Sequence, residues 1–256
     1  MRIFVTGLGG YLGRAIAELN SGVAGISGRA QADVRDVNAV ANALDAAGAD
    51  AVIHTAYIQD GPDARSTNLD GSQVVARAAA ERGLRLVHLS TDVVFSGKLE
   101  RPLREDDTAD PITGYGRTKA DAEAAVMAAH PGAVLVRTSL IYGGATPSRQ
   151  ERLALDPALS FYEDELRCPI AAPDLAAAVL ELAARPEISG PLHVAGRDAL
   201  SRLEFAQLIS TASGRDPGAV RGARRPPDRP GDLRLDCTCA HSLLSTRIRG
   251  VRDLLR

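Results

Sequence analysis

The chain has 256 residues, which is enough for a nucleotide-binding domain with a smaller substrate lobe. Thirty basic and 32 acidic residues leave a net charge of -2, so we expect a small-molecule partner and neither nucleic acid nor a membrane. The three cysteines form neither a disulfide framework nor a zinc pattern, and no apolar run is long enough to span a bilayer. No charged leader precedes the first apolar strand, which favours an unprocessed cytoplasmic protein, and no metal site is predicted.

A glycine-rich turn near the start is the first candidate site. The apolar run from Ile3 to Val5 leads into Thr6-Gly-Leu-Gly-Gly-Tyr-Leu-Gly13, and helical spacing follows over residues 14 to 19. A strand, a tight turn and a helix N-terminus can hold a dinucleotide pyrophosphate through backbone N–H groups and the helix dipole. Because glycines also serve ordinary turns, the pattern alone leaves that alternative open. The residues assigned to this cofactor site are Gly7, Gly9, Gly10, Tyr11, Leu12 and Gly13.

A second short strand is predicted over Val23–Ser27, and Arg29 follows its end. An acidic side chain at this edge would bind the adenosine ribose of NAD, whereas a basic one suits the extra phosphate of NADP. Arg29 therefore favours NADP, in the form of NADPH, over NAD, although a solvated loop arginine is the alternative. Asp33 and Val34 are expected beside the adenine.

A helix over Val37–Ala47 and a buried strand over Ala51–His54 come next in the chain. Small residues after that strand would let the cofactor lie flat, and an Ala-rich helix is predicted over Asp63–Glu81. We interpret His54, and His88 in the following strand, as core histidines rather than catalytic ones. The cofactor contacts predicted from this region are Thr55, Ala56, Tyr57 and Asn68.

A fourth strand is predicted over Leu84–Leu89. It would deliver Ser90, Thr91 and Asp92 to the carboxyl edge of a parallel sheet, where open α/β folds place their chemistry. A hydroxyl there can point at a bound carbonyl group. The stretch Phe95–Pro111 is rich in charge, Gly and Pro, and we predict that it forms a mobile lid over the site.

Tyr115 and Lys119 lie near the start of a predicted helix over Thr113–Ala129. Residues four apart share one helical face, so the ammonium group can stabilise the phenolate and lower the pKa of Tyr115 toward neutrality. This spacing suits a proton donor beside a cofactor-binding cation, and an ordinary surface pair is the alternative.

The second half of the chain is less regular. A fifth strand over Ala133–Thr138 is followed by the weakly patterned residues 144–167, which we interpret as a substrate-facing excursion. Ser201 and Glu204 form a capping-box pattern. The other predicted elements are a helix over Pro173–Ala184, a strand over Leu192–Ala195, a helix over Leu203–Ala212, a basic proline-rich stretch over Ala223–Gly231 and a terminal helix.

The glycine turn, Thr91 and the Tyr115/Lys119 pair occur in an order that resembles the extended short-chain dehydrogenases/reductases acting on nucleotide sugars. Five motifs resemble the dTDP-4-dehydrorhamnose reductase family: Ser90-Thr-Asp-Val-Val-Phe-Ser-Gly97, Tyr115-Gly-Arg-Thr-Lys119, Val136-Arg-Thr-Ser-Leu-Ile-Tyr-Gly143, Ala172-Pro-Asp-Leu-Ala176 and Arg229-Pro-Gly-Asp-Leu-Arg-Leu-Asp236. The resemblance implies an α/β fold, a Rossmann-type doubly wound parallel sheet with a small C-terminal substrate lobe. The NAD(P)-binding domain would span residues 1–143, completed by 168–196, and the lobe would span 144–167 and 197–256.

The same resemblance implies NADPH-dependent reduction of a 4-keto nucleotide sugar or a related carbonyl compound, and leaves a homodimer open. Tyr115 would donate a proton to the carbonyl oxygen, Lys119 would hold the nicotinamide ribose, and Thr91 would hydrogen-bond the oxygen as charge develops on it. Further cofactor contacts would be Ser90, Thr138, Ser139 and Leu140, besides Tyr115 and Lys119. Substrate contacts would be Thr91, Asp92, Val93, Leu140 and Arg229, and the cations available for a diphosphate are Arg149, Arg152, Arg224, Arg225 and Arg229.

Some residues depart from the family pattern. Leu140 and Val93 stand where members usually carry aromatic residues, and the chain has no Trp, so the sugar pocket is expected to differ. A sugar-nucleotide epimerase or dehydratase is one alternative, but Val93 replaces the acid of the dehydratases and Arg29 disfavours the NAD that epimerases retain. A non-catalytic NADP-binding regulatory subunit is another, since the beta subunit of methionine adenosyltransferase resembles this family. The complete catalytic set favours an enzyme.

Overall fold

Six parallel strands form the central sheet of the computed structural model, which describes residues 1–255. In spatial order they are β10 (Gly190–His193), β5 (Val134–Thr138), β4 (Arg85–Thr91), β3 (Ala51–His54), β1 (Ile3–Thr6) and β2 (Ala24–Ile26). All neighbouring strands run parallel. The chain passes from β1 outward to β2 and then back to β3 on the other side, so a crevice opens between β1 and β3 at the carboxyl edge of the sheet.

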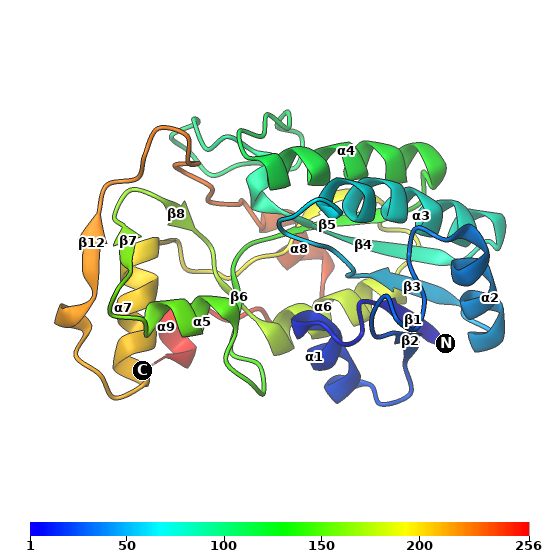
Figure 1. Cartoon of the computed structure of the whole chain (residues 1–256), viewed down its shortest axis with the longest axis horizontal. Coiled ribbons are helices and arrows are strands. Elements are labelled where there is room, and N and C mark those ends of the chain that lie inside the picture. The colour runs from blue at the N-terminus through cyan, green and yellow to red at the C-terminus, as the bar shows by residue number, and fades with distance from the viewer. Residues whose placement is uncertain (256) are drawn as a thin grey trace.

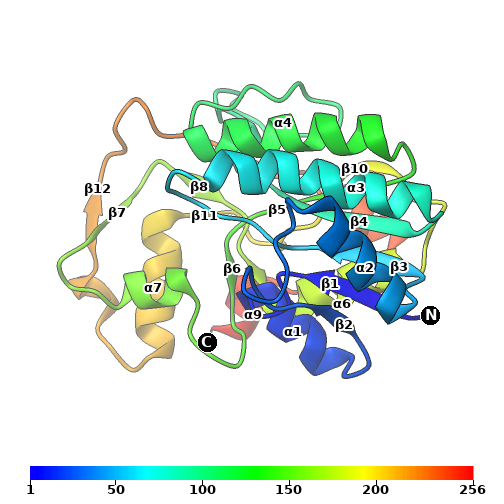
Figure 2. The ribbon, with the colours of Figure 1, turned by 45° about the vertical axis from the view of Figure 1, so that its right-hand side comes forward.

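Helices cover both faces of this sheet, as Figures 1 and 2 show. One face carries α2 (Val37–Ala47), α3 (Gly71–Glu81) and α4 (Gly114–Ala129), and the other carries α1 (Tyr11–Leu19), α6 (Ala172–Ala183) and α8 (Thr238–Leu243). The predicted fold class, a Rossmann-type doubly wound parallel sheet, is confirmed. None of the helices in residues 1–255 is both long and apolar enough to cross a bilayer.

The side chains of β1 alternate between the two faces of the sheet. Ile3 and Val5 join the apolar cluster under α1 and α6, whereas Phe4 joins the cluster under the other helices. Because both faces are covered, the central strands are almost wholly apolar, as in the buried run Ala51–His54. This burial explains why short apolar runs predicted the strands so closely.

Two predicted segments differ from the structure. The helix predicted over Asp63–Glu81 begins with a π-helical turn at Ser66–Asp70 before α3. The stretch predicted as a mobile lid, Phe95–Pro111, does not lie over the cavity, because buried residues anchor it to the protein elsewhere, and its mobility stays a prediction. It follows a 3₁₀ turn at Asp92–Val94. Phe95 and Leu103 are buried, and Leu103 bridges to Leu235 near the C-terminus. None of the residues 95–111 lines the cavity described below.

A smaller lobe with its own apolar cluster lies beside the sheet, on the left in Figure 1. Its elements are β6 (Ile141–Tyr142), α5 (Arg149–Ala154), β7 (Ser160–Tyr162), β8 (Leu166–Arg167), β9 (Ile170–Ala171), β11 (Leu200–Ser201), α7 (Arg202–Ala212), a 3₁₀ turn (Pro217–Ala219), β12 (Arg221–Ala223) and α9 (Val251–Leu254). β11 pairs antiparallel with β8, while β12 pairs with β7 and β6 with β9. The predicted capping box at Ser201 and Glu204 is confirmed at the start of α7.

We expect Ile16→Ala to lower the free energy of unfolding by about 2–5 kcal/mol, because Ile16 is fully buried between α1 and the sheet and its truncation leaves a cavity. Leu19→Ala on the same helix is the matched control. The Leu19 side chain is 53% exposed, so its loss should change stability by no more than about 0.5 kcal/mol. Urea unfolding of both variants tests this, and equal losses would contradict the packing of α1.

Candidate active site

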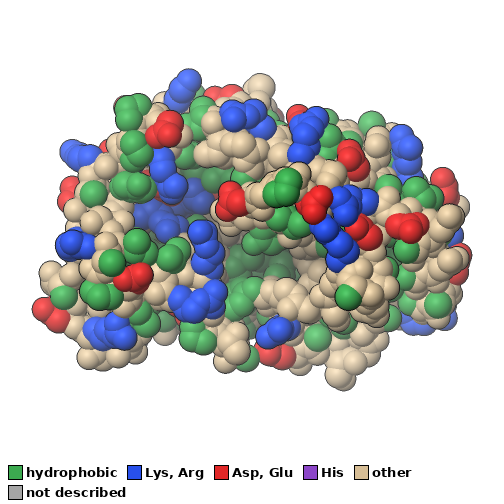
Figure 3. All heavy atoms as spheres, in the orientation of Figure 1, with side chains coloured by type: hydrophobic (Ala, Val, Ile, Leu, Met, Phe, Trp, Pro, Cys, Tyr) green, Lys and Arg blue, Asp and Glu red, His purple; other side chains and the backbone are tan. Residues whose placement is uncertain are grey.

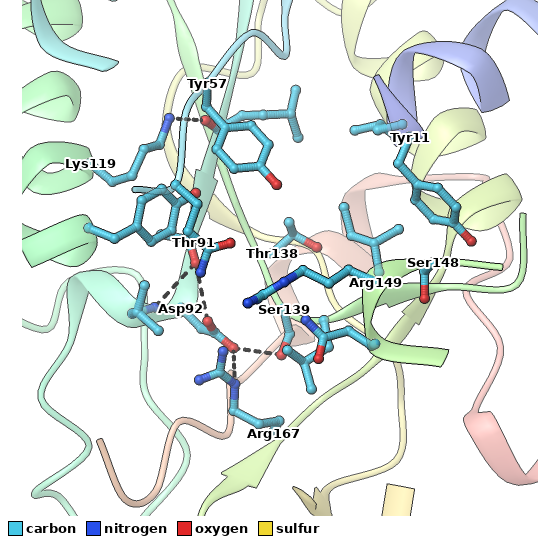
Figure 4. A pocket seen from close by; sticks show the side chains of 18 of the residues that line it. Tyr11, Tyr57, Thr91, Asp92, Lys119, Thr138, Ser139, Ser148, Arg149 and Arg167 are labelled. Atoms are coloured by element: carbon cyan, nitrogen blue, oxygen red, sulfur yellow. Dashed lines mark hydrogen bonds and ion pairs between the residues drawn. The ribbon is translucent and has the colours of Figure 1, made fainter. Parts of the chain in front are cut away.

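A cavity of about 810 Å³ lies between the carboxyl edge of the sheet and the lobe. Figure 3 shows it as a hollow with apolar and basic side chains on its walls, and Figure 4 shows its interior. The predicted site residues that line it are Gly9, Gly10, Tyr11, Leu12, Thr55, Tyr57, Ser90, Thr91, Asp92, Val93, Tyr115, Lys119, Thr138, Ser139, Leu140 and Arg229. Those outside its lining are Gly7, Gly13, Arg29, Asp33, Val34, Ala56 and Asn68.

The glycine turn closes one end of the cavity with backbone alone. Gly7 has a φ of +73°, and a Cβ there would lie 2.8 Å from the Ala56 nitrogen. A Cβ on Gly13 would overlap the Gly7 carbonyl oxygen. α1 starts after Gly10 with no side-chain cap, so the N–H groups of its first turn are left for another acceptor. These residues fit a dinucleotide pyrophosphate.

Lys119 is buried beneath the cavity, where its ammonium group donates to the Leu89 carbonyl at 2.7 Å and to His88 Nε2 at 3.3 Å. Burial lowers the pKa of Lys119 to about 8, so the side chain keeps most of its charge at neutral pH. Burial also holds the pKa of His88 well below its usual value, which makes this histidine a neutral acceptor. His54 is a satisfied core histidine, since both of its ring nitrogens meet hydroxyl groups.

Tyr115 lies in the first turn of α4, with its ring centre 5.8 Å from that of Tyr57. Burial raises the pKa of Tyr115 above its usual value, and the nearby Tyr57 and Asp92 raise it further. The prediction that Lys119 lowers this pKa was therefore wrong, because the ammonium group is directed to a backbone carbonyl of β4. A phenol that keeps its proton at neutral pH can serve as a proton donor.

Thr91 is the last residue of β4, and its hydroxyl forms hydrogen bonds with the two residues that follow it. It donates to Asp92 Oδ1 at 3.3 Å and accepts from the Val93 N–H at 3.4 Å. The other Asp92 oxygen accepts from the Ser139 hydroxyl at 2.6 Å and pairs with Arg167 Nε at 3.0 Å (Figure 4). Burial raises the pKa of Asp92, and the Arg167 charge opposes the rise. This carboxyl group thus joins the end of β4 to the segment after β5 and to β8.

Arg29, predicted to bind the extra phosphate of NADP, is exposed at the end of β2 and pairs with Asp63 at 2.9 Å. Asp33 is held by Arg35 at 2.6 Å, and this hydrogen bond lowers the pKa of Asp33 to about 2. Val34 is buried in the core beneath α2 and α3. The cofactor roles of these residues stay predictions.

Asn68 is fully buried and does not face the cavity. Its side-chain oxygen accepts from the Ile58 N–H at 2.8 Å, and its amide group donates to the Ile58 carbonyl at 2.8 Å and to the Thr118 hydroxyl at 3.1 Å. Asn68 therefore fixes the loop after β3 against α4. Because that loop carries Tyr57, Asn68 positions one wall of the cavity from behind.

Comparison with known proteins places this geometry in a family. Residues 1–256 match the sequence model of a family described as the RmlD substrate binding domain. The chain belongs to this family. The predicted membership of the dTDP-4-dehydrorhamnose reductase family is confirmed by relatives of that name.

One such relative, a dTDP-4-dehydrorhamnose reductase of Mycolicibacterium smegmatis, is 34% identical over 278 residues, which cover 100% of this chain and 84% of the relative. Methionine adenosyltransferase 2 subunit beta of Pongo abelii is 28% identical, covering 94% of this chain and 82% of that protein. A solved dTDP-4-dehydrorhamnose reductase structure from Clostridium acetobutylicum superposes with a TM-score of 0.85 at 25% identity, covering 99% and 96% of the two chains.

In this member of the family, the lobe contributes cavity residues that were not predicted. They are Thr146, Pro147, Ser148, Gln150, Glu165, Arg167, Arg202 and Pro230. Arg167 and Arg202 meet because β8 and β11 pair antiparallel, a contact that no local pattern indicates. Of the cations predicted for a diphosphate, Arg149, Arg152 and Arg229 line the cavity, whereas Arg224 and Arg225 do not. Across residues 1–255 no group of three or more His, Cys, Asp or Glu side chains could hold a metal ion.

Arg167→Met is expected to lower the free energy of unfolding by about 3–5 kcal/mol, because it leaves the buried Asp92 carboxylate without its cation. The double variant Asp92→Asn, Arg167→Met should lose less than this single variant, since a neutral amide needs no counter-charge. Urea unfolding in a double-mutant cycle measures the coupling. Additive losses would show that the two side chains do not stabilise one another.

Proposed function

We propose that this chain is an NADPH-dependent reductase of a 4-keto nucleotide sugar or a related carbonyl compound. The observation that carries the proposal is that Thr91, Tyr115 and Lys119 line one cavity whose other end is the glycine turn. Relatives named dTDP-4-dehydrorhamnose reductase, at 31% and 34% identity over nearly the whole chain, support it. A solved structure of that name from Bacillus anthracis is a complex with NADP, although its 21% identity shows the fold alone.

Reduction of a carbonyl group needs a hydride on carbon and a proton on oxygen. NADPH, when bound, supplies the hydride and becomes NADP⁺. The Tyr115 phenol, which burial keeps protonated, donates its proton to the carbonyl oxygen, and the product is an alcohol. Lys119, whose ammonium group is directed to the Leu89 carbonyl, would hold the nicotinamide ribose, and a proton from solvent replaces the one that Tyr115 transferred.

Thr91 can stabilise the oxygen while negative charge develops on it. Its hydrogen bond to Asp92 is long, at 3.3 Å, so the hydroxyl can exchange this acceptor for the substrate oxygen. Arg167 neutralises Asp92 on the opposite side at 3.0 Å, which weakens the competition of the carboxylate for the Thr91 proton. A donor fixed at the developing oxyanion stabilises the transition state more than the ground state.

Two other functions remain distinguishable by experiment. A dehydratase would need an acid after Asp92, and the isopropyl group of Val93 cannot transfer a proton. The methionine adenosyltransferase beta subunits at 26–28% identity make a non-catalytic role the expected alternative if the protein binds NADPH but reduces no carbonyl compound. A screen of NADPH oxidation over 4-keto nucleotide sugars and simple carbonyl compounds separates these outcomes.

We further propose that the chain is divided by function, with residues 1–143 and 168–196 for the cofactor and residues 144–167 and 197–256 for the substrate. The separate apolar cluster of the lobe, which includes Phe161 and Phe205, supports the division. Ala240, Leu244 and Ile248 pack instead on the sheet, so the C-terminal segment ties the lobe to the cofactor domain.

Tyr115→Phe is expected to lower kcat for carbonyl reduction by about 10²–10⁴-fold, because it removes the donated proton, while NADPH binding changes little. Tyr142→Phe is the matched control, because it removes a tyrosine hydroxyl that lies outside the cavity lining and has no hydrogen-bond partner among the described residues. Stopped-flow NADPH oxidation and fluorescence titration with NADPH provide the two readouts. Full activity in Tyr115→Phe would exclude the proposed acid.

Arg29→Asp is expected to narrow or reverse the preference for NADPH over NADH, because a carboxylate repels the extra phosphate and accepts hydrogen bonds from a ribose. The control is Arg77→Asp, which makes the same charge change at an exposed position of α3. Dissociation constants of both cofactors measure the effect. An unchanged ratio in Arg29→Asp would show that this arginine does not bind the phosphate.

A further inference from the structure

Two arginine side chains contact one buried carboxylate at the lobe end of the cavity, and a third arginine lies beside them. Arg229 Nη2 lies 2.9 Å from Glu165 Oε2, and Arg167 Nη1 lies 3.4 Å from Glu165 Oε1. Arg202 lies beside them, since its backbone N–H donates to the Glu165 carbonyl and β11 pairs with β8. We call Arg167, Arg202 and Arg229 the arginine cluster.

The arginine cluster carries more positive charge than its neighbours neutralise. Glu165 is 1% exposed and forms ion pairs with Arg167 and Arg229. The second carboxylate is that of Asp92, which pairs with Arg167 on its other side. Among the described residues Arg202 forms no ion pair, and its guanidinium donates only to the amide oxygen of Gln150 at 2.9 Å. Three cations therefore face two anions in a partly dehydrated site, which leaves one positive charge uncompensated.

Burial and the nearby Arg167 charge lower the pKa of Arg202 to about 10. Such a shift means that its charged form is disfavoured where it lies, and an anion beside it would remove the penalty. All three guanidinium groups line the cavity, and Figure 3 shows basic side chains gathered within the hollow on its left side. The missing negative charge can thus come from a ligand.

The arginine cluster also lies close to the proposed reaction centre. Arg167 contacts Asp92 at 3.0 Å, and Asp92 accepts from the Thr91 hydroxyl at 3.3 Å. One carboxyl group therefore separates the cluster from the residue that would hold the reacting carbonyl oxygen. In a nucleotide sugar the diphosphate is attached to C1, across the ring from C4, whereas a substituent on C5 is adjacent to C4. Arg149 and Arg152 of α5 also line the cavity and form no ion pair with Asp92 or Glu165, so they remain available to the diphosphate.

We propose that the arginine cluster binds a second anionic group of the substrate, a carboxylate carried by the sugar on the carbon next to the reacting carbonyl. The proposal rests on the proposed function and specifies its substrate class as a nucleotide-linked uronate-type sugar. Planar guanidinium groups match the two oxygens of a carboxylate, and they match phosphate oxygens equally well. The same chemistry could therefore come from the nucleotide diphosphate, and the experiment must separate the two sources.

The test is isothermal titration of the NADPH-saturated protein with dTDP, dTDP-glucose and dTDP-glucuronic acid. These ligands carry no 4-keto group, so NADPH does not reduce them. We expect the glucuronic acid derivative to bind about tenfold or more tightly than dTDP-glucose, as one added charge-assisted contact provides. Arg202→Met should remove this advantage while leaving the affinities for dTDP and dTDP-glucose within about twofold.

The control is Arg215→Met, which removes a charge from the same lobe at a residue outside the cavity lining and should keep the tenfold difference. Arg202→Lys keeps the charge but loses the planar guanidinium group with its paired N–H donors, so it should keep part of the tenfold difference. Equal binding of dTDP-glucose and dTDP-glucuronic acid by the unmodified protein would overturn the proposal that the arginine cluster binds a sugar carboxylate. The proposed reductase function would still stand. If Arg202→Met weakens the binding of dTDP as much as that of dTDP-glucuronic acid, the arginine cluster binds the diphosphate, and the carboxylate proposal is overturned. If none of the three ligands binds while NADPH does, the nucleotide-sugar function fails, and this proposal fails with it.

Discussion

The close packing of α1 on the turn after β1 fixes the geometry on which the rest of the cavity depends. No side chain fits at Gly13, where a Cβ would overlap the Gly7 carbonyl oxygen, or at Gly25, where it would overlap the Val5 carbonyl oxygen. The first contact brings the helix N-terminus onto the turn, and the second brings β2 against β1. The uncapped N–H groups of α1 therefore open at the same edge where β3, β4 and β5 end. These two contacts thus place the end of the cavity that is proposed for the dinucleotide beside the strand ends that carry the proposed reaction centre.

Below that edge, buried ion pairs hold elements that are distant in the sequence. Arg137 of β5 pairs with Glu123 of α4 at 2.8 Å, and Arg167 of β8 pairs with Asp92 at 3.0 Å. Such pairs add little net stability over apolar side chains of the same size, because dehydration of the charges offsets their attraction. What they contribute is position, since neither partner can move without leaving a buried charge exposed to an apolar core. In this chain they fix α4, with Tyr115 and Lys119, and the lobe relative to the end of β4.

Local sequence patterns predicted the part of the site that local structure creates. The glycine turn, the ends of the parallel strands and the four-residue spacing of Tyr115 and Lys119 each lie within one strand-to-helix unit, so periodicity and turn chemistry were sufficient. The patterns did not reveal contacts between distant segments. The stretch Phe95–Pro111 has the composition of a mobile loop, yet Leu103 is buried through its bridge to Leu235. The pKa of Tyr115 was predicted in the wrong direction because spacing reports the distance along a helix, whereas burial and the orientation of the Lys119 ammonium decide the shift.

The substrate end of the cavity shows the same limit with a functional consequence. Leu140 and Val93 present apolar surfaces without rings to the cavity, so they cannot stack on a sugar face as an aromatic side chain would. The wall opposite is charged instead, and its arginines converge only because β8 pairs with β11. A site lined by guanidinium groups rather than by rings favours charge recognition over non-directional contact, and it discriminates against ligands that lack the matching anion. Under the proposed carboxylate recognition, the choice of substrate depends on the pairing of β8 with β11, a contact between segments that are distant in the sequence.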